Sequence, residues 1–225
     1  MVPDICDSII IQQGHTIAAD TSVKAFSLRI NSGGTLNISN AAVNLQLGEK
    51  DQATNMIDNY GILNISNGTV TINGRLKLNT GSTFSMTGGS IILNSNTGDA
   101  FTSLSNGNAI VEAAAAMLSF SFTGGTLQIT DPPLGALSQS VNCPYDFGPN
   151  STLILGDGSS VKSSNNSDGF GGISFPNKIG KLIIDAAIKT GNRQFINKKA
   201  LNVKGNMEVR TGSGVILQAP ITVNK

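Results

Sequence analysis

The chain has 225 residues, of which 39% are hydrophobic, 5% aromatic and 13% charged, and its formal net charge is +1. No run of 18 apolar residues occurs, so the sequence predicts no transmembrane helix, and no basic-then-apolar signal sequence opens the chain. With no Trp and two Tyr, the core is expected to be aliphatic and narrow, as in a repeat protein.

The first thirty residues are expected to form a cap and the first strands. Strands are predicted at 8–12, 16–18 and 25–30, with Gly14 in the turn between the first two. Pro3 and the polar residues after it predict the cap, because bare strand edges at the end of a stack would otherwise pair with other chains. Farther along, residues 36–63 are expected to form one coil that is enlarged by a loop at 48–55.

Residues 59–94 carry the clearest pattern of the chain. Pairs of apolar residues separated by one polar residue recur there, with Gly, Asn or Ser in every gap: Leu63/Ile65, Val70/Ile72, Leu76/Leu78, Phe84/Met86 and Ile91/Leu93. Each pair predicts a short strand and each gap a turn. Three strands with three turns take up about 21 residues, the length of one coil of a parallel β-helix.

The repeat becomes irregular after residue 94. A lateral insert is expected near 95–123, in which residues 112–118 are compatible with one or two helical turns, and 124–130 returns to the strand pattern. Residues 131–150 contain four of the seven prolines and no periodicity, which predicts a loop. The remaining residues, 151–225, are expected to form C-terminal coils.

These patterns predict an all-β fold, a single-stranded right-handed parallel β-helix, with residues 1–225 as one domain. A strand of four or five residues cannot bury its apolar side alone, whereas coils stacked at about 4.8 Å place each inward aliphatic on its counterpart. Turns that require positive φ account for the 26 glycines. The handedness follows from the usual crossover preference.

The charge is distributed unevenly along the sequence. Residues 176–225 hold nine Lys and Arg against two carboxylates, whereas residues 1–175 hold six basic and twelve acidic groups. This basic end is either a solvated face or a contact for an acidic polysaccharide or an anionic surface. The predicted ligand-binding residues are Lys178, Lys181, Arg193, Lys198 and Lys199. Nucleic acid is not expected as a partner, because no aromatic residues interleave with these lysines.

Metal and disulfide sites are weakly indicated. Asp157 and Asp168 lie in two Asp-Gly turns rich in oxygen ligands, which fit either ordinary turns or a calcium site; no other cofactor is expected. Cys6 and Cys143 are the only cysteines, and a disulfide between them is an alternative in an exported protein. Regular stacking would separate them by about five coils, near 24 Å. His15 has no metal-ligand companion at suitable spacing.

Catalytic and ice-binding interpretations are less favoured. β-Helix lyases and glycoside hydrolases need two ionisable groups close together on consecutive coils, and the carboxylates of this chain are interpreted as isolated in loops. An ice-binding face would need T-x-T on successive coils. Only Thr69 and Thr71 fit. The charged pair Arg75 and Lys77 is taken to interrupt the row of threonines that such a face would need, which we call the rank.

The opening of the chain carries a family resemblance. VPDICDSIIIQQGHTI followed by FSLRINSGGTLNISN resembles secreted β-helix modules of Bacteroidota surface proteins exported by the type IX system, and it is also similar to the eight-glycine β-helix domain. The later segment KIGKLIIDAAIKTGNRQFINKKALNVKGNMEVRTGSGVIL is similar to the repeats of the same modules. The resemblance implies a parallel β-helix in an extracellular or cell-surface protein. Because no signal sequence opens the chain, it is expected to be a mature or excised segment.

From these observations we expect a non-catalytic extracellular module of a larger cell-surface or secreted protein, serving as an adhesin, stalk or glycan-contact domain. Its expected partners are a polysaccharide or cell-surface glycan and neighbouring modules of a longer chain. The alternative is a carbohydrate-active enzyme, or a substrate-binding accessory domain, that acts on an acidic polysaccharide through the basic C-terminal coils. A third interpretation is end-to-end packing through the opposite charges of the two ends.

Overall fold

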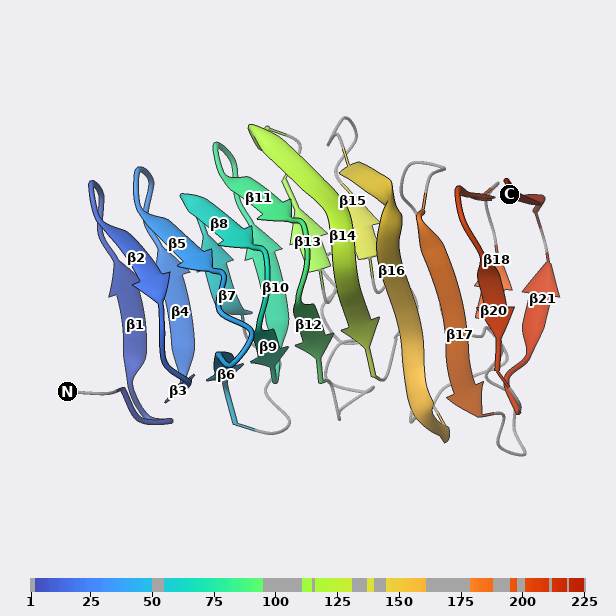
Figure 1. Cartoon of the computed structure of the whole chain (residues 1–225), viewed down its shortest axis with the longest axis horizontal. Helices are drawn as coiled ribbons and strands as arrows, with labels where there is room; N and C mark the ends of the chain where they lie inside the picture. Colours follow the sequence, from blue (N-terminus) through green and yellow to red (C-terminus); the bar gives the residue numbers. More distant parts are fainter. Residues whose placement is uncertain are drawn as a thin grey trace.

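A computed structural model of the chain confirms the predicted all-β parallel β-helix. The structure describes residues 3–49, 55–94, 111–114, 116–130, 137–139, 145–160, 179–187, 195–197, 201–210, 212–217 and 219–224. All strand pairs among these residues are parallel. The coils stack along the long axis of the molecule, and the two ends of the chain lie at opposite ends of the stack (Figure 1).

Each regular coil contributes three short strands. The first four coils are made of β1 (Ser8–Ile11), β2 (Thr16–Ala19), β3 (Val23–Ala25), β4 (Ser27–Ile30), β5 (Thr35–Ile38), β6 (Asn44–Leu47), β7 (Asn55–Asn59), β8 (Ile62–Ile65), β9 (Thr69–Ile72), β10 (Arg75–Leu78), β11 (Thr83–Met86) and β12 (Ser90–Leu93). Eight of them alternate buried residues with half-buried or exposed ones, because successive side chains of a strand point to opposite faces.

The later coils contain three longer strands, β14, β16 and β17, among strands of three residues each. They comprise β13 (Val111–Ala113), β14 (Ser119–Ile129), β15 (Leu137–Gln139), β16 (Tyr145–Ser160), β17 (Lys181–Ala187), β18 (Phe195–Asn197), β19 (Leu201–Val203), β20 (Met207–Val209), β21 (Val215–Leu217) and β22 (Ile221–Val223). Strands are therefore present within the predicted C-terminal coils, residues 151–225.

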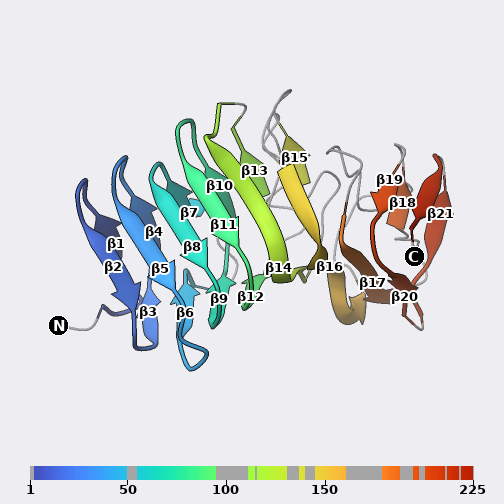
Figure 2. The ribbon, with the colours of Figure 1, turned by 45° about the horizontal axis from the view of Figure 1, so that its top comes forward.

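Two main sheets enclose the core. The first sheet has the order β1-β4-β7-β10-β13-β15. The second sheet has twelve strands. Nine of them form two columns, β2-β5-β8-β11-β14 and β3-β6-β9-β12-β14, which share β14. Beyond β14 the sheet continues through β16, β17 and β20. Figure 2 shows the first sheet lying behind the second along the stack.

Three sequence expectations differ from the structure. The strand predicted at 25–30 is split into β3 and β4 at Phe26, whose N–H donates to the carbonyl of Asp7 at a corner of the coil. Residues 112–118 contain strand β13 and a turn instead of helical turns, because Val111 and Ala113 are buried core positions. Residues 137–139 and 145–150, expected in a loop, lie in strands β15 and β16.

The core is a set of aliphatic columns that run along the stack. One column passes through eight consecutive strands, each residue in register with the next: Val23, Leu45, Val70, Ile91, Leu127, Leu153, Leu182 and Met207. A second column ends in a cluster of phenylalanines, in which the ring centroids of Phe84 and Phe120 are 5.1 Å apart and those of Phe120 and Phe147 are 5.5 Å apart. This continuous burial is what holds the short strands in place.

Buried asparagines connect the coils at one corner. Asn73 is buried, and its side-chain amide donates to the carbonyl of Gly48 at 2.8 Å. Its own side-chain oxygen accepts from Asn94 at 3.2 Å, and the Asn94 oxygen accepts from the Thr130 hydroxyl at 3.2 Å. The asparagines therefore satisfy polar groups at the corners as well as permitting the turns.

Candidate functional site

Charged residues form a ladder on the outer face of the first sheet. Arg29, Asp58, Lys77 and Glu112 occupy corresponding positions of β4, β7, β10 and β13, so that basic and acidic residues alternate from coil to coil. Arg29 Nη1 lies 3.8 Å from Asp58 Oδ2, and Asn79 donates to Asp58 Oδ1 at 2.7 Å. The interpretation that the carboxylates are isolated in loops is therefore wrong: coil stacking brings opposite charges together.

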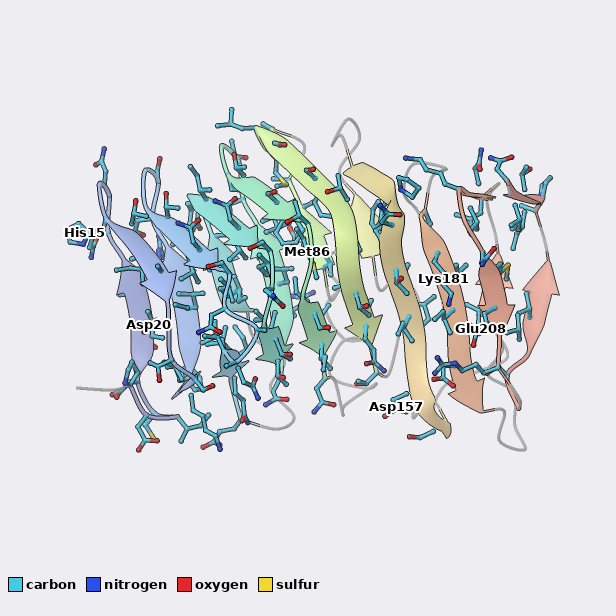
Figure 3. The ribbon with its side chains drawn as sticks, viewed as in Figure 1. His15, Asp20, Met86, Asp157, Lys181 and Glu208 are labelled. Atoms are coloured by element: carbon cyan, nitrogen blue, oxygen red, sulfur yellow. The ribbon has the colours of Figure 1, made fainter. Side chains whose placement is uncertain are left out.

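A second group of charges lies on the second sheet, on the neighbouring strands β17 and β20. We call Lys181, Asp185, Glu208 and Arg210 the Lys181 cluster. Lys181 Nζ is 3.3 Å from Glu208 Oε2, Arg210 Nε donates to Glu208 Oε1 at 3.0 Å, and Arg210 Nη1 also pairs with Asp185 Oδ2. Figure 3 shows Lys181 and Glu208 on these two strands near the C-terminal end of the stack.

The cluster fixes the ionisation of its members. Hydrogen bonds from Arg210 first, and then from Lys181, lower the pKa of Glu208. The hydrogen bonds to Glu208 and Asp185 raise the pKa of Arg210. Glu208 is therefore held as a carboxylate, which suits ion pairing or a basic role and does not suit a general acid at neutral pH.

The structure places only part of the predicted basic site. Lys181 is described, and Glu208 neutralises it. Two cations and two carboxylates make the Lys181 cluster electrically balanced. The other predicted contacts, Lys178, Arg193, Lys198 and Lys199, lie outside the described residues, so a net basic contact there stays a prediction.

Sequence reasoning missed Arg210, and it missed that the carboxylates Asp185 and Glu208 form ion pairs with the cations of this cluster. The signal was present in the segments KLIID and NMEVR. In the structure Leu182 is in register with Met207 and Ile184 with Val209. Aligning these aliphatic pairs would have placed Glu208 and Arg210 beside Lys181 and Asp185.

The other predicted site residues have local partners or lie outside the description. Asp157 Oδ1 accepts from the backbone N–H and the hydroxyl of Ser159, at 2.9 and 2.6 Å, which is ordinary turn chemistry. Within the part of the chain that is described, no three His, Cys, Asp or Glu residues gather as metal ligands; Asp168 lies outside that part. Cys6 is exposed, and Cys143 lies outside the described residues, so the disulfide between them stays a prediction.

The argument against an ice-binding face used the wrong neighbours. Strands that follow one another in the chain lie on different faces, and Thr69 and Thr71 of β9 lie between Asn44 and Gln46 of β6 and Ser90 and Ile92 of β12. The rank is therefore not interrupted by Arg75 and Lys77. It is interrupted by Gln46 and Ile92, so T-x-T is still not repeated on these successive coils.

An apolar hollow of about 290 Å³ lies at the N-terminal end of the stack. Its lining is mainly aliphatic and includes Pro3, Ile9, Ile17, Val23 and Leu36. His15 and Asp20 also lie at this end (Figure 3). We call this feature the N-terminal hollow.

The described residues include no helix long and apolar enough to cross a membrane. No protein-family model, no curated protein and no solved structure matches the chain.

Proposed function

We propose that the chain is a non-catalytic module of a larger extracellular or cell-surface protein, in which it serves as an adhesin, stalk or glycan-contact domain. The observation that best supports this proposal is the core column that runs through eight strands from Val23 to Met207 without a break. In such a stack each coil contacts its neighbours only, so length can be added without changing the rest of the structure. This property suits a spacer that carries binding surfaces away from a cell.

The charge pattern is consistent with a structural role for most described ionisable groups. The ladder of Arg29, Asp58, Lys77 and Glu112 and the Lys181 cluster both link one coil to the next. Exposed ion pairs stabilise weakly one at a time, about 0–1 kcal/mol each, and more as networks. A glycan contact would depend on Lys178, Arg193, Lys198 and Lys199 of the C-terminal coils, which lie outside the described residues, and the resemblance to type IX-exported Bacteroidota modules supports an extracellular location.

A carbohydrate-active enzyme remains the second candidate, because one observation favours it. Asp185 and Glu208 lie on neighbouring coils and both contact Arg210. Paired carboxylates are the groups that glycoside hydrolases use, and a carboxylate beside a cation suits proton abstraction from an acidic sugar. Against this role, Glu208 is already engaged by two cations.

One experiment separates the two candidates. The purified chain is placed on an array of neutral and acidic glycans at low and high salt, and the same polysaccharides are assayed for chain cleavage. The proposal expects no cleavage, and it expects any binding to acidic glycans to weaken in a Lys198→Glu, Lys199→Glu variant. Cleavage that is lost in Asp185→Asn or Glu208→Gln and retained in the matched variant Asp157→Asn would overturn the non-catalytic proposal.

A further inference from the structure

The described strands at either end of the stack each have one edge without a partner among the described strands. Among the strands that the structure describes, β1, β2 and β3 at the N-terminal end pair only with β4, β5 and β6. At the other end, β20, β21 and β22 pair only with β17, β18 and β19 within the same described set. We call these two sets of strands the N-terminal end face and the C-terminal end face. An open strand edge is a template for pairing with another chain.

Core side chains are exposed at both end faces. Ile17 is in register with Leu36 and occupies the same column, yet Ile17 is 45% exposed and Leu36 only 5%. At the other end, Val223 is 42% exposed while its register partner Val203 is fully buried. The exposure therefore marks places where core side chains reach the surface, and at the N-terminal end this surface includes the N-terminal hollow. Contiguous exposed apolar surface of this kind marks interaction sites.

The geometry of the strands favours a head-to-tail arrangement. All described strands run in parallel and each regular coil visits the sheets in the same order. The C-terminal end face of one copy can therefore continue onto the N-terminal end face of another by a shift along the stack axis, as one coil follows another. Two N-terminal ends brought face to face would have their strands reversed, and they would not match over three faces.

Charge complementarity supports the same arrangement. In residues 3–25, the carboxylates Asp4, Asp7 and Asp20 outnumber the single Lys24, and Asp20 lines the N-terminal hollow. Residues 176–225 hold nine basic residues against two acidic ones, so by sequence the C-terminal part of the chain is net basic. Net charges of opposite sign in the first and last parts of the chain favour contact between unlike ends over contact between like ends.

We propose that the N-terminal end face is a docking site for the C-terminal end face of a second copy of this chain. Ile17 enters the apolar contact from one copy, and Val223 enters it from the other. The contact is heterologous, since the two surfaces differ, so repetition gives open linear chains of molecules instead of a closed dimer.

The test uses the whole chain and two blocked variants. Light scattering over a concentration series measures the mass of the wild type, of Ile17→Lys and of Val223→Lys, each at low and high salt. The wild type is expected to grow in mass with concentration, and less at high salt. Each variant alone is expected to associate at least tenfold more weakly than the wild type. Its intact end face would have to dock onto the altered end face of the next copy, where the introduced lysine would be buried. An equimolar mixture of the two variants is expected to form one-to-one dimers that do not grow further.

The control variant is Ile62→Lys. Ile62 is 37% exposed and lies away from both end faces, so this variant should associate as the wild type does. Circular dichroism checks that each variant keeps its fold; if Ile17→Lys disturbs the first coil, Val223→Lys still tests the contact from the other end. A wild type that stays monomeric at every concentration overturns the proposal. Dimers of Val223→Lys alone would indicate pairing of two N-terminal ends, and growth that neither variant reduces would indicate non-specific aggregation; both outcomes also overturn it.

Discussion

Leu63 and Phe84 lie directly opposite each other in the neighbouring strands β8 and β11. Both are buried, with exposed fractions of 1% and 3%. Val70 and Ile91 have the same relationship in β9 and β12. Because these two independent pairs have the same separation along the chain, the spacing of inward apolar residues sets the coil length over 59–94. Each inward side chain is buried by its counterparts in the coils on either side.

Truncating one inward side chain should therefore destabilise the coils on either side of it. Leu63→Ala leaves a cavity between Leu36 and Phe84, which flank Leu63 in the column, and is expected to lower the free energy of unfolding by about 2–5 kcal/mol. Urea denaturation followed by circular dichroism measures the change. The adjacent Ile62, which is 37% exposed, provides the control, and Ile62→Ala should cost about 0.5 kcal/mol. Equal losses for the two variants would contradict the assignment of the inward face.

The sequence predicts the strands well where coils have equal length, and less well elsewhere. Within 59–94 the repeat is regular, so the partners of Leu63 and Val70 follow from spacing alone. Elsewhere the coils are longer. Leu36 pairs with Leu63, as the enlarged coil predicted over 36–63 requires, whereas Phe84 pairs with Phe120, and both pairs are farther apart in the chain than Leu63 and Phe84 are. A constant period cannot find a partner such as Phe120, because inserted residues change the offset without changing the stacking.

The same effect explains the errors at the candidate sites. The ladder partners Arg29 and Asp58, and likewise Lys181 and Glu208, are separated in the sequence by a whole coil together with its corner insertions. No local motif connects these residues, and only the alignment of core columns brings them together. Short strands such as β13 and β15 have three residues each, too few for alternation to distinguish them from loops.

Gly61 provides a test of close packing between turns. A Cβ at this position would overlap the backbone carbonyl oxygens of Gly34 and Asn31 in the preceding coil. Gly61→Ala is therefore expected to force a backbone shift and to lower stability by about 3 kcal/mol, measured as the change in the free energy of unfolding in urea.

Gly81 separates this packing effect from backbone conformation. It has a φ of +76° and nothing within 4 Å of an added Cβ. Gly81→Ala should cost about 1–2 kcal/mol because of the left-handed backbone alone, and Gly81→Asn less, since Asn tolerates that conformation. A Gly61→Ala variant as stable as the wild type would show that the coils are spaced more widely than the structure describes.

The buried corner asparagines should be more important than the exposed ones. Asn73→Ala removes the donor to the Gly48 carbonyl and the acceptor for Asn94, and it is expected to cost about 1–3 kcal/mol because buried polar groups lose their partners. Asn64→Ala is the matched variant: Asn64 donates to Asn37 at 2.9 Å on a half-buried outer surface, where water can replace the bond. Thermal melting of both variants under the same conditions compares them, and a larger loss for Asn64→Ala would contradict the ranking.

The Lys181 cluster should make the stability of the C-terminal coils sensitive to acid. Folding lowers the pKa of Glu208, chiefly through the hydrogen bond from Arg210, so the folded chain binds a proton at this site less readily than the unfolded chain. The stabilisation is complete above the unfolded pKa and is lost as the pH falls through the lowered folded value. The melting temperature of the wild type is therefore expected to fall as the pH drops below about 4.3, the ordinary pKa of a glutamate, and more steeply than that of Glu208→Gln.

Removing Arg210 tests whether the cluster causes this acid sensitivity. In Arg210→Gln the main cause of the lowered pKa of Glu208 is absent, so a further Glu208→Gln change should alter the pH dependence of the melting temperature much less than it does in the wild type. The difference between the two effects of Glu208→Gln is the coupling between the side chains. If Glu208→Gln flattens the pH dependence equally with and without Arg210, then Lys181 is what lowers the pKa of Glu208, and the hydrogen bond between Glu208 and Arg210 contributes little to the acid sensitivity.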